Sequence, residues 1–133
     1  MTAKEWLGRA RRLRLRLDAL QDSKQRAYAR AISRTSGMGE RVSGGEPEDR
    51  LAAYTEVSLA ADRQIEKLEQ VRAEILQVIG QIEDNTLAAL LTEYYVNDRT
   101  WEEVAVQMGY SWRQTMRLHG QALGKVREIT GLS

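Results

Sequence analysis

The spacing of the apolar residues constrains the fold most, because it alternates between three and four over two long stretches. The first stretch comprises Trp6, Ala10, Leu13, Leu17, Leu20, Lys24, Ala27 and Ala31. The second comprises Val57, Ala61, Ile65, Leu68, Arg72, Ile75, Ile79 and Ile82. Such spacing places side chains on one face of an α-helix. We therefore expect two long helices, at about residues 3–35 and 48–83, joined by a Gly-rich loop at residues 36–47.

Two long amphipathic helices joined by a short loop fold back on each other as an antiparallel hairpin. The second stretch also resembles a coiled-coil seam of about three heptads. The sequence thus predicts an all-α protein in which residues 1–83 form a helical hairpin that serves dimerisation or another interaction. A single Pro in 133 residues agrees with this prediction.

Three shorter helices are predicted within residues 85–130, because helix-capping residues recur there. Asp84 can cap the first, and Thr100 with Glu103 and Ser111 with Gln114 fit the capping-box pattern. Gly109 allows a tight turn between the last two helices, and Gly131 ends the final one. Small or apolar residues suited to a close helix crossing are Val104, Ala105, Met108, Tyr110 and Leu118, with Thr115 where an aliphatic residue is usual. This pattern predicts a three-helix, helix-turn-helix domain.

The exposed face of the last helix has the chemistry expected of a DNA reader. Residues 112–127 contain four Lys/Arg and no Asp/Glu. Arg can donate two hydrogen bonds to guanine and Gln to adenine, whereas Lys or Arg farther along the helix can contact phosphates. The predicted DNA-contacting residues are Trp112, Arg113, Gln114, Met116, Arg117, Gln121, Lys125 and Arg127.

The segment from Thr100 to Ser111, TWEEVAVQMGYS, and the segment QALGKVR at residues 121–127 resemble the promoter-reading helix-turn-helix, region four, of bacterial sigma factors. With the opening MTAKEWL and RLHGQAL at residues 117–123, the chain also resembles small sigma-like proteins of phages and prophages of Gram-positive bacteria. That family is related to phage late-gene activators. The resemblance implies a transcription regulator in the bacterial host cytoplasm, with double-stranded DNA as partner and RNA polymerase as a further candidate.

Two other functions remain open. The chain could be a protein-interaction module that docks on RNA polymerase or another phage protein, or a small terminase-like subunit that recognises DNA. A C-terminal unit of about 45 residues is near the lower size limit for an isolated core. We therefore expect a homodimer, although the hairpin could pair within or between chains.

The charges are unevenly distributed along the chain. Residues 1–35 carry a net charge of +7 and residues 51–95 a net charge of −5. The arginines between Arg9 and Arg16 are therefore expected partly to pair with the acidic second helix and partly to face solvent. Gripping phosphates or lying on a membrane are the alternatives for this cluster.

The sequence predicts no catalytic site, no metal site and no cofactor. His119 is the only histidine and has no partners at ligand or catalytic spacing, so it is expected to be a polar residue on or beside the DNA-facing helix. The chain has no Cys, which suits a reducing compartment, and no apolar run long enough to cross a membrane.

Overall fold

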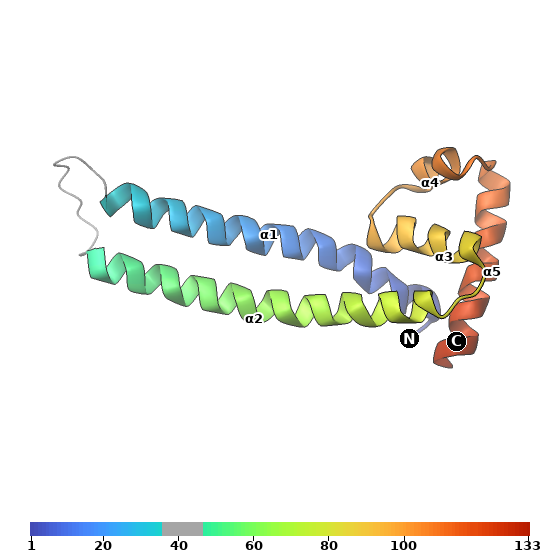
Figure 1. Cartoon of the computed structure of the whole chain (residues 1–133), viewed down its shortest axis with the longest axis horizontal. Coiled ribbons are helices and arrows are strands. Elements are labelled where there is room, and N and C mark those ends of the chain that lie inside the picture. Colours follow the sequence, from blue (N-terminus) through green and yellow to red (C-terminus); the bar gives the residue numbers. More distant parts are fainter. Residues whose placement is uncertain (36–46) are drawn as a thin grey trace. The chain divides into compact units, whose positions relative to one another are not determined.

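All regular secondary structure that the computed structural model describes, at residues 1–35 and 47–133, is helical. The elements in chain order are α1 (Ala3–Thr35), α2 (Pro47–Gly80), α3 (Asn85–Leu91), the π-helical turn η1 (Thr92–Val96), α4 (Trp101–Met108) and α5 (Trp112–Thr130) (Figure 1). The predicted all-α class is therefore confirmed. The predicted Gly-rich loop lies outside the described residues except for Pro47, which begins α2.

The structure divides into two compact units at different points from the predicted boundary near residue 84. Unit 1 comprises Met1–Leu15 with Glu69–Ser133, and unit 2 comprises Arg16–Leu68. The start of α1 belongs to unit 1 because Ala3, Leu7 and Ala10 are buried in one core with α3 and α5. The Ala3 N–H also donates to the Ser133 carbonyl at 3.0 Å, so the two chain ends meet.

The core of unit 1 is built from the apolar faces of all its helices. From α1, α2 and the following turn it contains Ala3, Leu7, Ala10, Ile75, Ile79 and Ile82, and from α3 to α5 it contains Leu87, Leu90, Leu91, Tyr95, Val96, Val104, Ala122, Leu123 and Val126. Asp84 caps α3 by accepting the Thr86 and Leu87 N–H groups, as the sequence predicted. Leu7 is fully buried in this core, whereas Trp6, the neighbouring position of the predicted stripe, is only half-buried.

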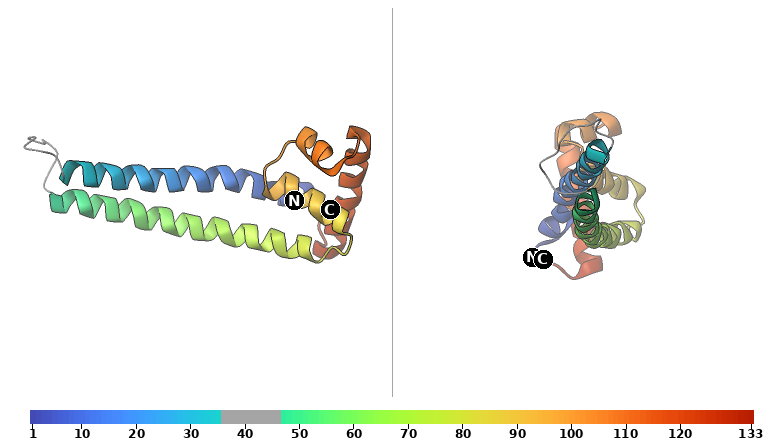
Figure 2. Two further views of the ribbon diagram at one scale, coloured as in Figure 1. Left: turned by 45° about the horizontal axis from the view of Figure 1, so that its top comes forward. Right: turned by 90° about the vertical axis from the view of Figure 1, so that its left-hand side faces the viewer.

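Unit 2 is a pair of helical segments, one from α1 and one from α2, that lie side by side (Figure 2). The predicted stripes are buried here at Leu17, Ala27, Ala31, Ala61 and Leu68. Lys24 Nζ pairs with Asp62 Oδ1 at 2.8 Å across the two segments, and the rings of Tyr28 and Tyr54 are 5.6 Å apart. None of the described helices is long and apolar enough to cross a lipid bilayer.

Candidate nucleic-acid interface

Short-range hydrogen bonds fix where α4 and α5 begin and end. The Thr100 hydroxyl accepts the Glu103 N–H and the Glu103 carboxylate accepts the Thr100 N–H, both at 3.1 Å, which completes the predicted capping box. These bonds hold the pKa of the Glu103 carboxyl below its usual value. Gly109, with φ of 73°, ends α4 in the left-handed conformation that favours glycine. The Ser111 hydroxyl then accepts the Gln114 N–H at the start of α5.

The crossing of α4 and α5 is closed by buried small residues. Val104 and Thr115 are fully buried. Thr115 fits the aliphatic position because its hydroxyl donates to the Ser111 carbonyl at 2.8 Å, which leaves the methyl group to pack. The expectation that the Tyr110 side chain closes this corner is wrong, since it is 38 % exposed. Instead, the backbone N–H of Tyr110 donates to the Ala105 carbonyl and so fixes the turn after α4.

The predicted DNA-contacting residues divide by exposure along α5. Six are exposed and two are half-buried: Trp112, Arg113, Arg117, Gln121, Lys125 and Arg127 are exposed, whereas Gln114 and Met116 are half-buried. Arg113, Arg117 and Gln121 follow one another at intervals of four, so they form one line on the helix surface. Lys125 Nζ lies 3.9 Å from Glu128 Oε2, an acidic neighbour just beyond the purely basic stretch.

Gly120 lies next to this line and leaves the surface of α5 open. A Cβ atom placed on Gly120 would meet nothing within 4 Å. Glycine inside a helix costs about 1 kcal/mol relative to alanine. No packing contact in the described structure requires it. An open backbone at this point allows a large binding partner to approach α5 closely.

His119 lies on α5, the helix on which it was expected, and it belongs to the buried face of that helix. His119 is only 8 % exposed, and its Nε2 lies 2.7 Å from the Tyr95 hydroxyl oxygen. The buried residues Thr115, His119, Ala122 and Val126 are spaced by four, three and four. That periodicity in the sequence could have placed the histidine in the core.

Burial changes the ionisation of this histidine–tyrosine pair. It lowers the pKa of His119 to about 4, with a smaller contribution from the positive charge of Lys4, and it raises the pKa of Tyr95. The neutral Tyr95 hydroxyl can therefore donate to an unprotonated Nε2 of His119. The pair is suited to a structural role at neutral pH.

The stability of the protein should consequently fall on acidification. The folded pKa of His119, about 4, lies below its usual value of 6.5, so the unfolded chain takes up its proton first as pH falls. We expect unfolding free energy to drop by about 2 kcal/mol between about pH 7 and pH 5. Urea unfolding at both pH values measures this. His119→Gln should remove most of the dependence in this window, and an unchanged dependence would refute the assignment.

Four side chains from separate elements form a continuous stack behind the α4–α5 crossing. The Arg11 guanidinium carbon of α1 lies 4.1 Å from the Tyr94 ring centroid. The Tyr94 ring stacks on Trp101, the first residue of α4, with centroids 3.8 Å apart and an 11° interplanar angle. Trp101 in turn lies 4.5 Å from the His119 ring of α5. The stack thus joins α1, η1, α4 and α5.

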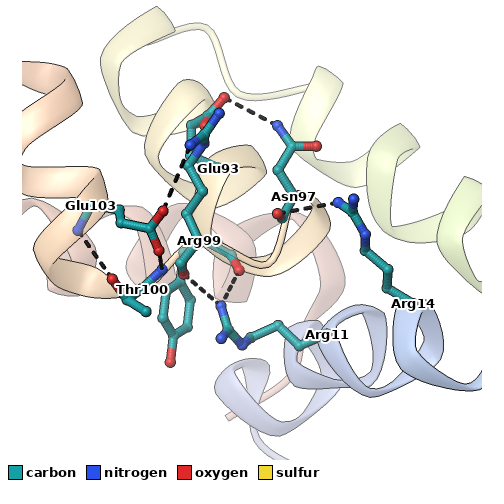
Figure 3. A network of polar contacts seen from close by, with 8 residues as sticks. Arg11, Arg14, Glu93, Asn97, Arg99, Thr100 and Glu103 are labelled. Carbon is teal, nitrogen blue, oxygen red and sulfur yellow. Dashed lines mark hydrogen bonds and ion pairs between the residues drawn. The ribbon is translucent and has the colours of Figure 1, made fainter.

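The turn before α4 is held by polar contacts that come mainly from α1 and from η1 (Figure 3). Arg11 donates to the carbonyls of Tyr94 and Arg99, the latter at 2.8 Å. Arg14 donates to the Asn97 carbonyl at 3.2 Å and lies 3.9 Å from the Asp98 carboxylate.

The Glu93 carboxylate accepts from Asn97 and pairs with Arg99, which closes the predicted turn at residues 97–99 from the other side. The expectation that the N-terminal arginines pair with α2 is therefore wrong for Arg11 and Arg14. Backbone carbonyls left free where η1 ends are their main partners, and only the tertiary structure brings these within reach.

No family model, curated protein or solved structure matches the chain. Among the described residues, no group of three or more His, Asp or Glu side chains is arranged to hold a metal ion.

Proposed function

We propose that the protein is a sequence-specific, double-stranded DNA-binding transcription regulator. In this proposal α4 and α5 form a helix-turn-helix, and α5 enters the major groove. The observation that carries the proposal is the exposed line of Arg113, Arg117 and Gln121 on a helix whose opposite face is buried. A helix held on one face by its own core and basic on the other suits the dimensions of the major groove.

Each exposed residue then has a role. Arg113 and Arg117 donate to guanine O6 and N7 or to phosphates, and Gln121 donates to and accepts from adenine. Trp112, which is 52 % exposed, meets a thymine methyl or a sugar. Lys125 and Arg127 lie toward the far end of α5 and contact phosphates. The open backbone at Gly120 allows the duplex to approach.

The polar groups of α4 are consistent with a DNA-facing α5. The Glu103 carboxylate already accepts the Thr100 N–H and lies 3.9 Å from Arg99, so its charge is partly compensated. The acidic side chains at the start of α4 favour a position for DNA along α5 rather than over the outer face of α4.

Selection of binding sites from random duplex DNA tests the proposal with the full chain. We expect enrichment of one sequence motif, followed by specific binding in a mobility shift. The logarithm of the affinity should fall steeply with the logarithm of the salt concentration, by about 0.9 per phosphate contact. Absence of any enriched motif and of binding at low salt would exclude the proposal. It would favour the interaction-module hypothesis, which a pull-down with RNA polymerase addresses.

We also propose a relation to the sigma-like proteins of phages. The sigma-like phage relation predicts that the selected motif occurs in a late-gene promoter. A terminase-like subunit would instead assemble into a large ring, which light scattering detects. In each of these proposals, the predicted hairpin of residues 1–83 presents the DNA-binding part of the chain or holds another protein.

A further inference from the structure

A small cavity opens in unit 1 where the first turns of α1 pack against η1. Its volume is about 380 Å³. Its lining includes Lys4, Glu5, Gly8, Arg11 and Arg12 of α1 and Tyr94 of η1. Cavities of roughly 300–1,000 Å³ are the usual size of small-molecule sites. The cavity therefore has room for a small ligand.

Gly8 leaves a gap between two cations on one side of α1. Lys4 lies one turn before Gly8 and Arg12 one turn after it, so the three residues follow one another along the helix surface. A Cβ atom placed on Gly8 would lie 3.6 Å from Nη1 of Arg12, so this guanidinium extends over Gly8. Lys4 and Arg12 begin about 12 Å apart along the helix axis. Two such long side chains can close on one small group that lies above Gly8.

The cavity is positively charged. Lys4 and Arg12 are exposed, and neither forms an ion pair with another residue that the structure describes. Arg11 adds a third positive charge, although it also donates to two backbone carbonyls. Because Glu5 is the one carboxylate beside these three cations, the lining has a net charge of +2. A phosphate monoester carries about −1.5 to −2 at neutral pH and so matches this charge.

The aromatic wall of the cavity has no free face for a nucleobase. The Arg11 guanidinium carbon lies 4.1 Å from the Tyr94 ring centroid, and the Trp101 ring stacks on Tyr94 at 3.8 Å. Two groups so close to one ring must cover opposite faces of it. Single-stranded nucleic acids bind largely by stacking bases on aromatic faces, so they do not fit this cavity.

The cavity also lies away from the proposed DNA-reading line. Its Tyr94 wall connects through Trp101 to the His119 ring. His119 belongs to the buried face of α5, whereas Arg113 and Arg117 are on the exposed face. A duplex held by the exposed face of α5 is therefore a poor source of a phosphate for this cavity.

We propose that this cavity binds the phosphate group of a small phosphorylated molecule. Lys4 and Arg12 donate charge-assisted hydrogen bonds to the phosphate oxygens from either side of Gly8. Arg11 adds positive potential from the side of η1. Phosphate binding, an alternative for the arginines between Arg9 and Arg16, is thereby assigned to one cavity.

Calorimetric titration of the full chain with inorganic phosphate tests the proposal, with chloride at the same ionic strength as the reference. We expect one phosphate per chain with a Kd of about 1 mM, as a ligand of so few atoms allows. Lys4→Gln with Arg12→Gln should weaken binding by about tenfold or more, because two charged donors are lost. Gly8→Leu should abolish binding without removing a charge, because its side chain fills the gap.

A matched control tests whether the position of the charges matters. Arg63→Gln with Lys67→Gln removes the same two charges from exposed positions of α2 and should leave phosphate binding unchanged. No phosphate binding by the wild type, or equal weakening by the two double variants, would overturn the proposal. Circular dichroism checks that each variant is folded.

The duplex selected from random DNA identifies the source of the phosphate. Lys4→Gln with Arg12→Gln should bind this duplex as tightly as the α2 control does. If instead it loses DNA affinity as strongly as it loses inorganic phosphate, the phosphate belongs to DNA, and the proposal of a small-molecule site is wrong. The inference does not depend on the proposed DNA binding, since the phosphate titration contains no DNA.

Discussion

Replacing both Arg113 and Arg117 by alanine should weaken specific DNA binding by about a hundredfold or more. Each bidentate arginine–base contact contributes about 1–3 kcal/mol of discrimination, and these two side chains are neighbours on the exposed line of α5. Because both are exposed and neither forms an ion pair with another described residue, folding should be preserved. Fluorescence anisotropy with the selected duplex measures the affinity, and circular dichroism checks the fold.

A matched control separates base reading from loss of charge. Arg63→Ala with Lys67→Ala removes the same two charges from exposed positions of α2. This variant should bind the selected duplex within about threefold of the wild type, because neither side chain lies on the helix proposed to read the bases. Equal losses in the two double variants would show that α5 does not read the sequence.

Arg11→Ala should destabilise the protein by about 3 kcal/mol. The substitution removes two hydrogen bonds from a charged donor, each contributing about 1.5–3 kcal/mol before partial replacement by water. It also removes a cation–π contact of about 0.5–1 kcal/mol with Tyr94. The carbonyls of Tyr94 and Arg99 would lose this donor, and Trp101 would lose the support behind its stacking partner. Urea unfolding measures the change.

The segments in which hydrogen exchange accelerates distinguish the structural role of Arg11 from a general loss of charge. Hydrogen exchange should accelerate first in η1 and α4, which the stack and the turn at residues 97–99 hold together. Arg16→Ala, at an exposed arginine of the same helix, should change stability by less than about 0.5 kcal/mol. If Arg11→Ala behaves like Arg16→Ala, the contacts of Arg11 do not stabilise unit 1.

The predictable part of the structure rests on local rules. The ends of α4 and α5 follow from residues that satisfy free backbone groups within a few positions. The hydroxyls of Thr100 and Ser111 accept free N–H groups, and the Gly131 N–H donates to the free Arg127 carbonyl. The buried stripe of α5 follows from periodicity, as Leu123 and Val126 confirm. His119 occupies a position in the same stripe, but its polarity gives no sign of its burial.

The sequence by itself determined the helices, the caps of α3, α4 and α5 and most of the buried apolar positions, because capping and the helical period act within a few residues. The end of α2 at Gly80 rather than at residue 83 and the π-helical turn η1 were not determined by these local rules. Only the tertiary structure decided that the first residues of α1 share a core with α5, and that Arg11 and Arg14 hold the turn before α4. These partners are more than eighty residues apart, and backbone carbonyls carry no residue-type signal. An arginine that satisfies them looks in the sequence like any other surface charge. The apolar spacing thus predicts the helices but not the division of α1 between two units.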